Sequence, residues 1–363
     1  MKAALISLGS TSSKWTAEAM RKYFDQVDEL DIREIEVSLG SKNYGVFYKG
    51  EHLEEYDCIF GKGSFRYSAL LRSITSILYD KCYMPIEQDS FSVVHDKLLT
   101  HLVLQKHDIP MPTTYLSATV NAAKAILKKV NYPIIMKFPQ GTQGKGVMVA
   151  DSYAGASSVL DALQSLKQPF IIQEYIETDG VDIRAIVVKG KVIAAMERKA
   201  ETGEKRSNIH QGGSGEKVEL DTQTKKITIE TAKVLGADIC AVDILSSHKG
   251  PLIIEANLSP GLQGITKATN MDIADKIAKA LYLKTKEFIE NKKSTKANQI
   301  LEEVGIKTSK DEVKQVITNL DLRGNRLLLP EIITNITQFG EKEEVVLKAK
   351  KDHLYIKTFN IEK

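Results

Sequence analysis

Polar side chains inside apolar segments are the residues of this sequence best suited to chemistry. Asp243 stands within the apolar run 239–245, and Glu255 and Asn257 end the run 252–257. Glu255 and Asn257 lie two positions apart and therefore share one face of a strand. If the two strands pair, three oxygen ligands converge as Mg²⁺ requires, with phosphate oxygens completing the shell. The alternative is a solvated pair at a sheet edge, which is less favourable because unpaired carboxylates within apolar strands are costly.

A glycine-rich loop and a lysine indicate an anion-binding element. The loop GTQGKG, residues 141–146, lies between the predicted strands 133–137 and 147–150. This position excludes a Walker-type phosphate loop, which needs a helix after it. A glycine hairpin can still close over a triphosphate with Lys145 facing the anions, and a plain hairpin tip is the alternative. Lys137 ends the first strand without an adjacent acid, so it either pairs with a bound phosphate or extends to the surface.

Arginines follow acidic residues in the next segment of the chain. Asp182 and Arg184 alternate with apolar residues and therefore share a strand face. Arginines beside carboxylates serve as salt-bridge partners or as clamps for anionic substrate groups, and the sequence leaves both roles open. The seven histidines lack the spacing of a metal site, and no serine or cysteine stands in a nucleophile elbow.

Length and charge limit the class of protein. At about 150 residues per domain, 363 residues correspond to two or three domains. The 50 basic and 47 acidic side chains leave a net charge of +3, which disfavours non-specific nucleic-acid binding. Cys58, Cys82 and Cys240 form no C-x-x-C pair, and no apolar stretch reaches the length of about 18 residues that a membrane helix needs. We therefore expect a cytoplasmic protein that has no membrane segment.

Residues 1–90 are predicted to form a small α/β domain with a parallel sheet. Residues 3–24 and 57–78 each read as a strand, a glycine turn and a helix, which is how an open α/β layer begins. Residues 89–90 supply an N-cap for a helix that continues through Val103.

The rest of the chain is predicted to form two further parts. Lys189-Gly190 joins two strands as a hairpin, and a polar, basic hinge covers 290–296. Beyond the hinge we expect a small appended domain. The elements predicted from the hairpin onward are strands 183–188 and 191–196, helix 224–235, strands 238–245 and 252–257, helix 271–287, helix 310–319, and a terminal hairpin at 345–350 and 354–357.

Short segments form a specific set when they are taken in order and with their gaps: His95-Asp96-Lys97, Lys137 with Gly141 to Gly146, Gln173-Glu174-Tyr175-Ile176, Asp182-Ile183-Arg184, Met196-Glu197-Arg198, Arg206-Ser207-Asn208-Ile209-His210, Asp243, and Glu255-Ala256-Asn257-Leu258-Ser259-Pro260-Gly261. By these segments, residues 91 to about 284 resemble the ATP-grasp superfamily, and within it the RimK-like carboxylate–amine ligases that add glutamate to an acceptor. Gln211 departs from the pattern where a basic residue is expected, and 261–266 is neutral where close relatives are acidic, both near the expected acceptor side.

The resemblance implies the fold class and the domain order. It implies a mixed α/β and α+β multidomain protein in which an ATP-grasp fold follows a small parallel α/β domain and precedes a small C-terminal appended domain. The implied bounds are 1–90 for the N-terminal domain, 91–288 for the ATP-grasp domain with a lid subdomain at 110–177 and a metal-binding subdomain at 178–288, and 296–363 for the appended domain, whose role the resemblance leaves open.

The resemblance also implies cofactors and residue roles. The cofactors are ATP and two Mg²⁺ or Mn²⁺ ions per site, and the metal ligands are Asp243, Glu255 and Asn257. The residues implied to stabilise the reacting acyl phosphate are Arg184, Arg206 and Asn208. The residues implied to bind ATP are Lys97 and Lys137 at the phosphates, Gly141, Gly144, Lys145 and Gly146 in the closing loop, Gln173, Glu174, Tyr175 and Ile176 at the adenine, Asp182 at the ribose, and Arg206, Ser207 and Asn208.

The implied reaction joins an acceptor carboxylate to the amine of an amino acid, most simply L-glutamate, through an acyl phosphate. Both steps build negative charge on oxygen and need positioned cations more than a protein nucleophile. The implied acceptor is a carboxylate such as the C-terminus of a ribosomal protein. Alternatives are a coenzyme of deazaflavin or pterin type, a carrier protein of lysine or arginine synthesis, and, in another class, a nucleotide-binding regulatory module without catalysis. We expect a homo-oligomer without a nucleic-acid partner.

Overall fold

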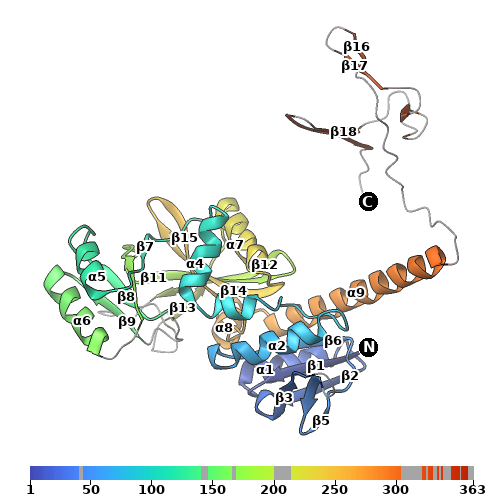
Figure 1. Ribbon diagram of the computed structural model, residues 1–363, viewed down its shortest axis with the longest axis horizontal. Coiled ribbons are helices and arrows are strands. Elements are labelled where there is room, and N and C mark those ends of the chain that lie inside the picture. The colour runs from blue at the N-terminus through green and yellow to red at the C-terminus, as the bar shows by residue number, and fades with distance from the viewer. Residues whose placement is uncertain are drawn as a thin grey trace. The chain divides into compact units, whose positions relative to one another are not determined.

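The chain folds into two compact units, Met1–Lys293 and Ser294–Lys363 (Figure 1). The computed structural model describes residues 1–40, 44–139, 146–165, 169–199, 214–303, 321–323, 326–329, 333–334, 337, 345–351 and 353–358. The domain boundaries expected inside the first unit remain predictions.

The first unit begins with a parallel sheet in the order β2-β1-β6. The predicted parallel sheet is confirmed, and β1 is buried almost throughout because its residues are apolar. Ser10 caps α1, its side chain accepting a hydrogen bond from the Ser13 amide. A small antiparallel sheet, β3-β4-β5, was not predicted. The elements are β1 (Lys2–Ser7), α1 (Thr11–Met20), β2 (Gln26–Asp31), β3 (Ile35–Ser38), β4 (Gly45–Tyr48), β5 (Glu51–His52), β6 (Cys58–Gly61) and α2 (Ser68–Leu78).

The single helix expected from residues 89–90 through Val103 is wrong. The structure has two helices there, α3 (Ser90–Val94) and α4 (Lys97–Lys106). Asp96 separates them because its backbone is extended and its carboxylate accepts hydrogen bonds from the amides of Leu98 and Leu99 at 2.9 and 3.1 Å. This is N-cap geometry, so a new helix begins at Lys97.

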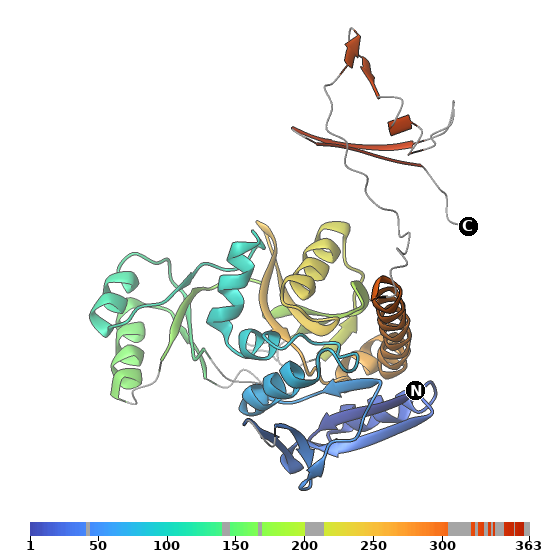
Figure 2. The same cartoon turned by 45° about the vertical axis from the view of Figure 1, so that its right-hand side comes forward.

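A second, four-stranded sheet has the order β7-β10-β8-β9, and we call it the lid sheet. The predicted hairpin is confirmed, since β8 and β9 pair antiparallel on either side of the glycine loop. Helices α5 and α6 pack together against this sheet (Figure 2). The elements are β7 (Thr114–Tyr115), α5 (Val120–Leu127), β8 (Ile134–Lys137), β9 (Val147–Ala150), α6 (Tyr153–Ser165) and β10 (Ile171–Glu174).

The third sheet is antiparallel and five-stranded, in the order β13-β12-β11-β14-β15. The expected hairpin at Lys189-Gly190 is confirmed. The boundary between the two units falls within the hinge expected at 290–296, but the backbone there is helical, because α9 continues through it. The segment holds no glycine or proline, and its lysines and glutamate favour helix. The elements are β11 (Val181–Val188), β12 (Lys191–Lys199), β13 (Ser214–Lys217), α7 (Thr222–Val234), β14 (Ile239–Ser247), β15 (Gly250–Asn257), α8 (Gln263–Thr269) and α9 (Ile273–Glu303).

Two separate hydrophobic cores stabilise the first unit. The larger core joins the parallel sheet to the five-stranded sheet, from Leu5 and Phe60 to Ile186 and Val242. The smaller core lies within the lid sheet and its two helices, with Met136 and Leu160 fully buried. The lid sheet is therefore packed independently of the rest of the unit.

The second unit contains two short antiparallel hairpins among its described residues. These are β16 (Asp321–Arg323) with β17 (Arg326–Leu328), and β18 (Val345–Lys350) with β19 (His353–Thr358), so the predicted terminal hairpin is confirmed. The helix expected at 310–319 lies outside the described residues. In the described part of the chain, no helix combines the length and apolar character needed to cross a bilayer.

Candidate active site

One face of the five-stranded sheet carries a row of charged side chains, and we call it the polar face. Asp243 on β14 lies directly opposite Arg184 on β11 and opposite Glu255 on β15. Asn257 lies opposite Ala241, two residues from Asp243. Because residues directly opposite each other project to the same face, Asp243, Glu255 and Asn257 share the polar face, as expected from their spacing.

A β-bulge sets this alignment. Ile244 pairs with Ile253, whereas the neighbouring Asp243 pairs with Glu255, so Ile254 is an extra residue on β15. Ile253 lies on the face of the sheet opposite Asp243, because its partner Ile244 is the neighbour of Asp243. Without the extra residue, strict alternation would place Glu255 on that opposite face as well. The bulge therefore turns Glu255 toward Asp243.

Four charged residues on the polar face form a buried network that we call the charge quartet: Asp182, Arg184, Arg198 and Asp243. Arg184 donates two hydrogen bonds to Asp243, from Nε to Oδ1 at 2.8 Å and from Nη2 to Oδ2 at 2.7 Å. Arg198 donates two to Asp182 at 2.6 Å each, and its Nη2 also lies 3.0 Å from Asp243 Oδ2. The quartet pairs two positive with two negative charges.

Burial makes the quartet sensitive to the loss of any member. The side chains of Arg198, Asp182 and Asp243 are 8% exposed, and that of Arg184 is 16% exposed. Burial alone would raise the pKa of Asp243, but Arg184 and Arg198 outweigh it and hold that pKa well below its usual range. Of the two roles that the sequence left open, the structure shows the arginines as salt-bridge partners.

Arg198→Met is expected to lower the free energy of unfolding by about 3 kcal/mol or more, because Asp182 then loses both of its bonds to a buried cation. Chemical denaturation monitored by circular dichroism measures this change. Arg33→Met is the matched control, since the Arg33–Asp31 pair is largely exposed, and it should change stability by less than about 1 kcal/mol. Equal effects of the two variants would contradict the structural role assigned to Arg198.

Lys137, at the end of β8, lies within reach of the charge of Glu255 on the polar face. It is 7% exposed, and its Nζ donates to Gln173 Oε1 at 2.8 Å, while Gln173 Nε2 donates to Thr114 Oγ1 at 2.8 Å. Burial lowers the pKa of Lys137 to about 8, Glu255 opposes this shift, and Lys97 adds to it. Glu255 and Lys97 are thus close enough to Lys137 for their charges to act on it.

The start of α4 connects Lys97 to the same region. The Lys97 amide donates to the Pro139 carbonyl at 2.9 Å, which fastens α4 to the segment that follows Lys137. The chain thereby brings together the two lysines that the sequence proposed for phosphate binding. Two like charges held near each other favour an anion between them.

His101 on α4 is a buried group that the sequence analysis did not single out. It is 3% exposed, and neither ring nitrogen has a partner with hydrogen-bond geometry among the described residues, although the Ile254 main chain approaches the ring. Burial first, and then Lys137 and Lys97, lower the pKa of His101 to about 4. Its position in α4, one turn after Lys97, is the signal in the sequence that could have identified it.

His101 is expected to make the protein acid-labile between pH 6.5 and pH 4. Since its folded pKa of about 4 lies below the ordinary value of 6.5, the unfolded chain binds the proton first and stability falls as the pH falls. The loss approaches about 3 kcal/mol at the low end. Denaturation curves across this pH range should be flatter for His101→Leu and unchanged in slope for the exposed control His248→Leu. A His101→Leu slope equal to wild type would contradict the prediction.

The hinge between the lid sheet and β11 carries the residues proposed to contact a base. Glu174 accepts from the Thr113 amide at 3.2 Å, and its carboxylate lies 3.4 Å from Lys249 Nζ. Tyr175 and Ile176 follow β10 without regular structure.

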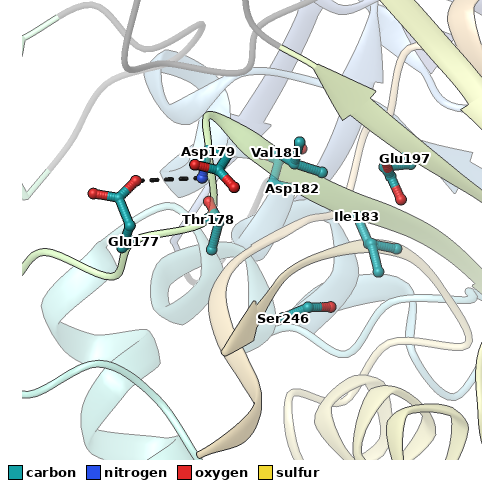
Figure 3. A pocket seen from close by; sticks show the side chains of 8 residues that line it. All are labelled: Glu177, Thr178, Asp179, Val181, Asp182, Ile183, Glu197 and Ser246. Atoms are coloured by element: carbon teal, nitrogen blue, oxygen red, sulfur yellow. Dashed lines mark hydrogen bonds between the residues drawn. The ribbon is translucent and has the colours of Figure 1, made fainter. Parts of the chain in front are cut away.

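A pocket of about 290 Å³ begins directly after this hinge (Figure 3). Ile183 and Glu197 are cross-strand partners on the face of the sheet opposite Arg184, and Ser246 shares that face because it lies two residues from Ile244. The sheet therefore separates most of this pocket from the charge quartet. The lining residues are Glu177, Thr178, Asp179, Val181, Asp182, Ile183, Glu197 and Ser246.

Several residues proposed from the sequence lie outside the described residues, namely Gly141, Gly144, Lys145, Arg206, Ser207 and Asn208. Gly146 is described, with φ at +79°. A Cβ there would lie 2.3 Å from Phe138 Cδ2, so only glycine fits this end of the loop.

Comparisons with known proteins identify the family of this chain. A family model described as "RimK-like ATP-grasp domain" matches residues 94–281. A protein of Pseudoalteromonas atlantica named "Probable alpha-L-glutamate ligase 2" is 37% identical over 285 residues, which cover 76% of this chain and 94% of that protein.

Solved structures share the fold at low sequence identity. The ATP-grasp ligase PsnB, complexed with minimal precursor, Mg and ADP, matches with a TM-score of 0.62 at 17% identity, over 78% of this chain and 98% of PsnB. A RimK domain ATP-grasp protein from Sphaerobacter thermophilus matches with a TM-score of 0.61 at 16% identity, over 77% of this chain and 98% of that chain. The matched family model, the curated relative and the order of the polar residues agree that this chain belongs to the RimK-like ATP-grasp family.

Proposed function

We propose that this chain, an ATP-dependent ligase, forms an amide bond between an acceptor carboxylate and the amine of L-glutamate. The observation that carries the proposal is the polar face, where Asp243 lies opposite Glu255 and the charge of Glu255 acts on Lys137. Curated relatives named as α-L-glutamate ligases support glutamate as the amino acid.

The donor set of the polar face fits Mg²⁺. Asp243, Glu255 and Asn257 offer carboxylate and amide oxygens, which are the ligands that this hard cation prefers. The carboxylate of Asp243 accepts three bonds from Arg184 and Arg198, one at Oδ1 and two at Oδ2. Because a carboxylate has about four acceptor sites, one site is left for a cation. Asn257 Oδ1 accepts from the Ser259 amide at 2.9 Å, which fixes its orientation. Two bound Mg²⁺ or Mn²⁺ ions would neutralise charge on the transferred phosphoryl group.

The nucleotide would lie between the lid sheet and the polar face. Lys97 and Lys137 are proposed to bind its phosphates. The negative charge of the phosphates would offset the effects of burial and of Lys97, both of which lower the pKa of Lys137. Glu174, Tyr175 and Ile176 are proposed to contact the adenine. Gln173 is proposed to orient Lys137, to which it is already hydrogen-bonded. The proposed residues outside the described ranges are Gly141, Gly144, Lys145, Arg206, Ser207 and Asn208, with Gly146 beside them.

Asp182 is proposed to contact the ribose. In the structure both of its carboxylate oxygens accept bonds from Arg198. A ribose hydroxyl would therefore bind a carboxylate that the charge quartet already holds in a fixed orientation.

The chemistry proceeds in two displacements. An oxygen of the acceptor carboxylate attacks the γ-phosphorus and ADP leaves, which gives an acyl phosphate. The glutamate amine then attacks the acyl carbon, phosphate leaves, and the amine loses a proton. Arg184 is proposed to stabilise the charge that develops on oxygen, because Asp243 uses only two of its five N–H donors.

The acceptor is proposed to be a peptide with a free carboxylate, such as the C-terminus of a ribosomal protein. Structural neighbours bound to precursor peptides support a peptide acceptor. The test incubates the protein with Mg²⁺, ATP, heavy glutamate and peptides that end in a free carboxylate or in an amide. Mass spectrometry should find a glutamyl adduct only on the free carboxylate.

Heavy oxygen in the acceptor carboxylate tests the acyl phosphate directly. One labelled oxygen should appear in the released phosphate, because the acceptor oxygen that attacks phosphorus departs with it. Phosphate release without any amide product, or an amide product without label in the phosphate, would refute the proposed reaction.

A further inference from the structure

Lys62 is a buried lysine whose charge is not paired by any residue in the described ranges. It is 5% exposed, immediately after β6, and its Nζ lies 5.6 Å from the centre of the Phe60 ring. In the described part of the chain, its ammonium group has no hydrogen-bond acceptor and no carboxylate within ion-pair distance. Burial lowers the pKa of Lys62 to about 8, which leaves most of the population charged at pH 7.

The other buried charged side chains of the described residues differ from Lys62 in this respect. Lys137 donates to Gln173, and Asp182, Arg198 and Asp243 bond one another in the charge quartet. An unpaired buried ammonium destabilises a fold, so a protein keeps one where an anion arrives to pair with it.

The main chain at Lys62 adjoins the strand that carries the proposed metal ligands. The Gly63 amide donates to Ser259 Oγ at 2.9 Å, and the Ser259 amide donates to Asn257 Oδ1 at 2.9 Å. A second bond, from the Leu262 amide to Ser12 Oγ at 2.8 Å, fastens the same loop to the start of α1. The carboxyl end of the parallel sheet is thus held against the loop that follows β15.

The orientation of Lys62 follows from its neighbours. A Cβ on Gly61 or Gly63 would lie within 3 Å of Leu71, so these glycines face α2. Lys62 alternates with them and faces the other side of the strand, together with Phe60. Ligands of open α/β sheets bind at this edge, beyond the carboxyl ends of the strands.

We propose that Lys62 binds a carboxylate of a substrate other than ATP, at the junction of the parallel sheet with the loop after β15. The inference rests on the proposed ligase function and adds a substrate contact from the N-terminal sheet. The carboxylate belongs to L-glutamate or to the peptide acceptor, and both sources share the same recognition by a buried ammonium group.

The test measures binding to the intact protein at pH 7 by calorimetry with Mg²⁺ and a non-hydrolysable ATP analogue present. The probes are L-glutamate and an acetylated tripeptide with a free carboxylate. Lys62→Met should weaken binding of one probe at least tenfold, and Lys62→Arg should recover most of it. The probe whose binding is weakened by Lys62→Met identifies the substrate that supplies the carboxylate. Lys14→Met, which removes a charge from an exposed position on α1, should leave both affinities unchanged.

A stability measurement separates this role from a structural one. Lys62→Met should raise the thermal midpoint, because it removes an unpaired buried charge, whereas a lysine that supports the fold would lower it when replaced. Failure of Lys62→Met to weaken either probe, or of wild-type protein to bind either one, would overturn the inference. Failure of wild-type protein to bind the ATP analogue would instead overturn the ligase proposal on which it rests.

Discussion

Glu255→Gln is expected to lower the rate of amide formation by about a thousandfold or more while the protein stays folded. The substitution keeps the shape of the side chain and removes its charge. Glu255 is the carboxylate of the polar face that lies outside the charge quartet, so its loss leaves every arginine bond of the quartet in place. The expected defect is therefore catalytic, and it should be accompanied by a higher Mg²⁺ requirement.

Steady-state rates at several Mg²⁺ concentrations measure this effect. Glu216→Gln is the matched control, because Glu216 is exposed and lies opposite Glu197 on the other face of the same sheet. The control should retain at least half of the wild-type rate. A Glu255→Gln protein with more than a tenth of wild-type activity would remove Glu255 from the proposed metal ligands.

Lys137→Met is expected to lower kcat/KM for ATP by about a hundredfold or more, an effect second in size to that of Glu255→Gln. Lys137 is buried, has neutral Gln173 as its hydrogen-bond partner among the described residues, and lies near the charge of Lys97. Methionine fits the same volume without a charge. The variant should therefore be at least as stable as wild type without nucleotide, but Mg-ATP should stabilise it much less.

Thermal unfolding with and without Mg-ATP reports the stability effect, and initial rates report kcat/KM. Lys128→Met, at an exposed position after α5, is the matched control and should behave as wild type in both assays. Equal stabilisation of Lys137→Met and wild type by Mg-ATP would contradict phosphate binding by Lys137.

The sequence predicted those parts of the site that depend on neighbouring residues in the chain. Glu255 and Asn257 share a face because they are two apart, and the pairing of their strand with that of Asp243 is confirmed. Lys137 stands at the mouth of a confirmed hairpin. Apolar runs and glycine turns were sufficient for these features, since each depends on local alternation and chain reversal.

The charge quartet could not be predicted, because it depends on an extra residue within β12. If the hairpin at Lys189-Gly190 had no bulge, residue-by-residue pairing from the turn would place Asp182 opposite Glu197. Two acidic side chains would then face each other. Ile193 is an extra residue on β12, and it shifts the register so that Asp182 pairs with Arg198. A bulge is set by packing across the whole sheet and leaves no clear local signal.

Helix ends were missed for a different reason. Asp96 reads equally well as a surface residue inside a helix and as a cap between two helices, and only its backbone geometry distinguishes the two. The polar residues at 290–296 lack an apolar stripe, yet they continue α9 because each tolerates helical geometry. Polarity alone therefore indicated a hinge where the backbone continues as a helix.

The separate hydrophobic core of the lid sheet has a mechanical consequence. Met136, Leu160 and their neighbours pack among themselves, while bonds such as those from Lys249 to Glu174 and from Lys97 to Pro139 join the sheet to the remainder of its unit. Because the two cores are separate, movement of the lid sheet about these tethers would leave both cores packed. Opening of the proposed nucleotide site would then require no unfolding of either core.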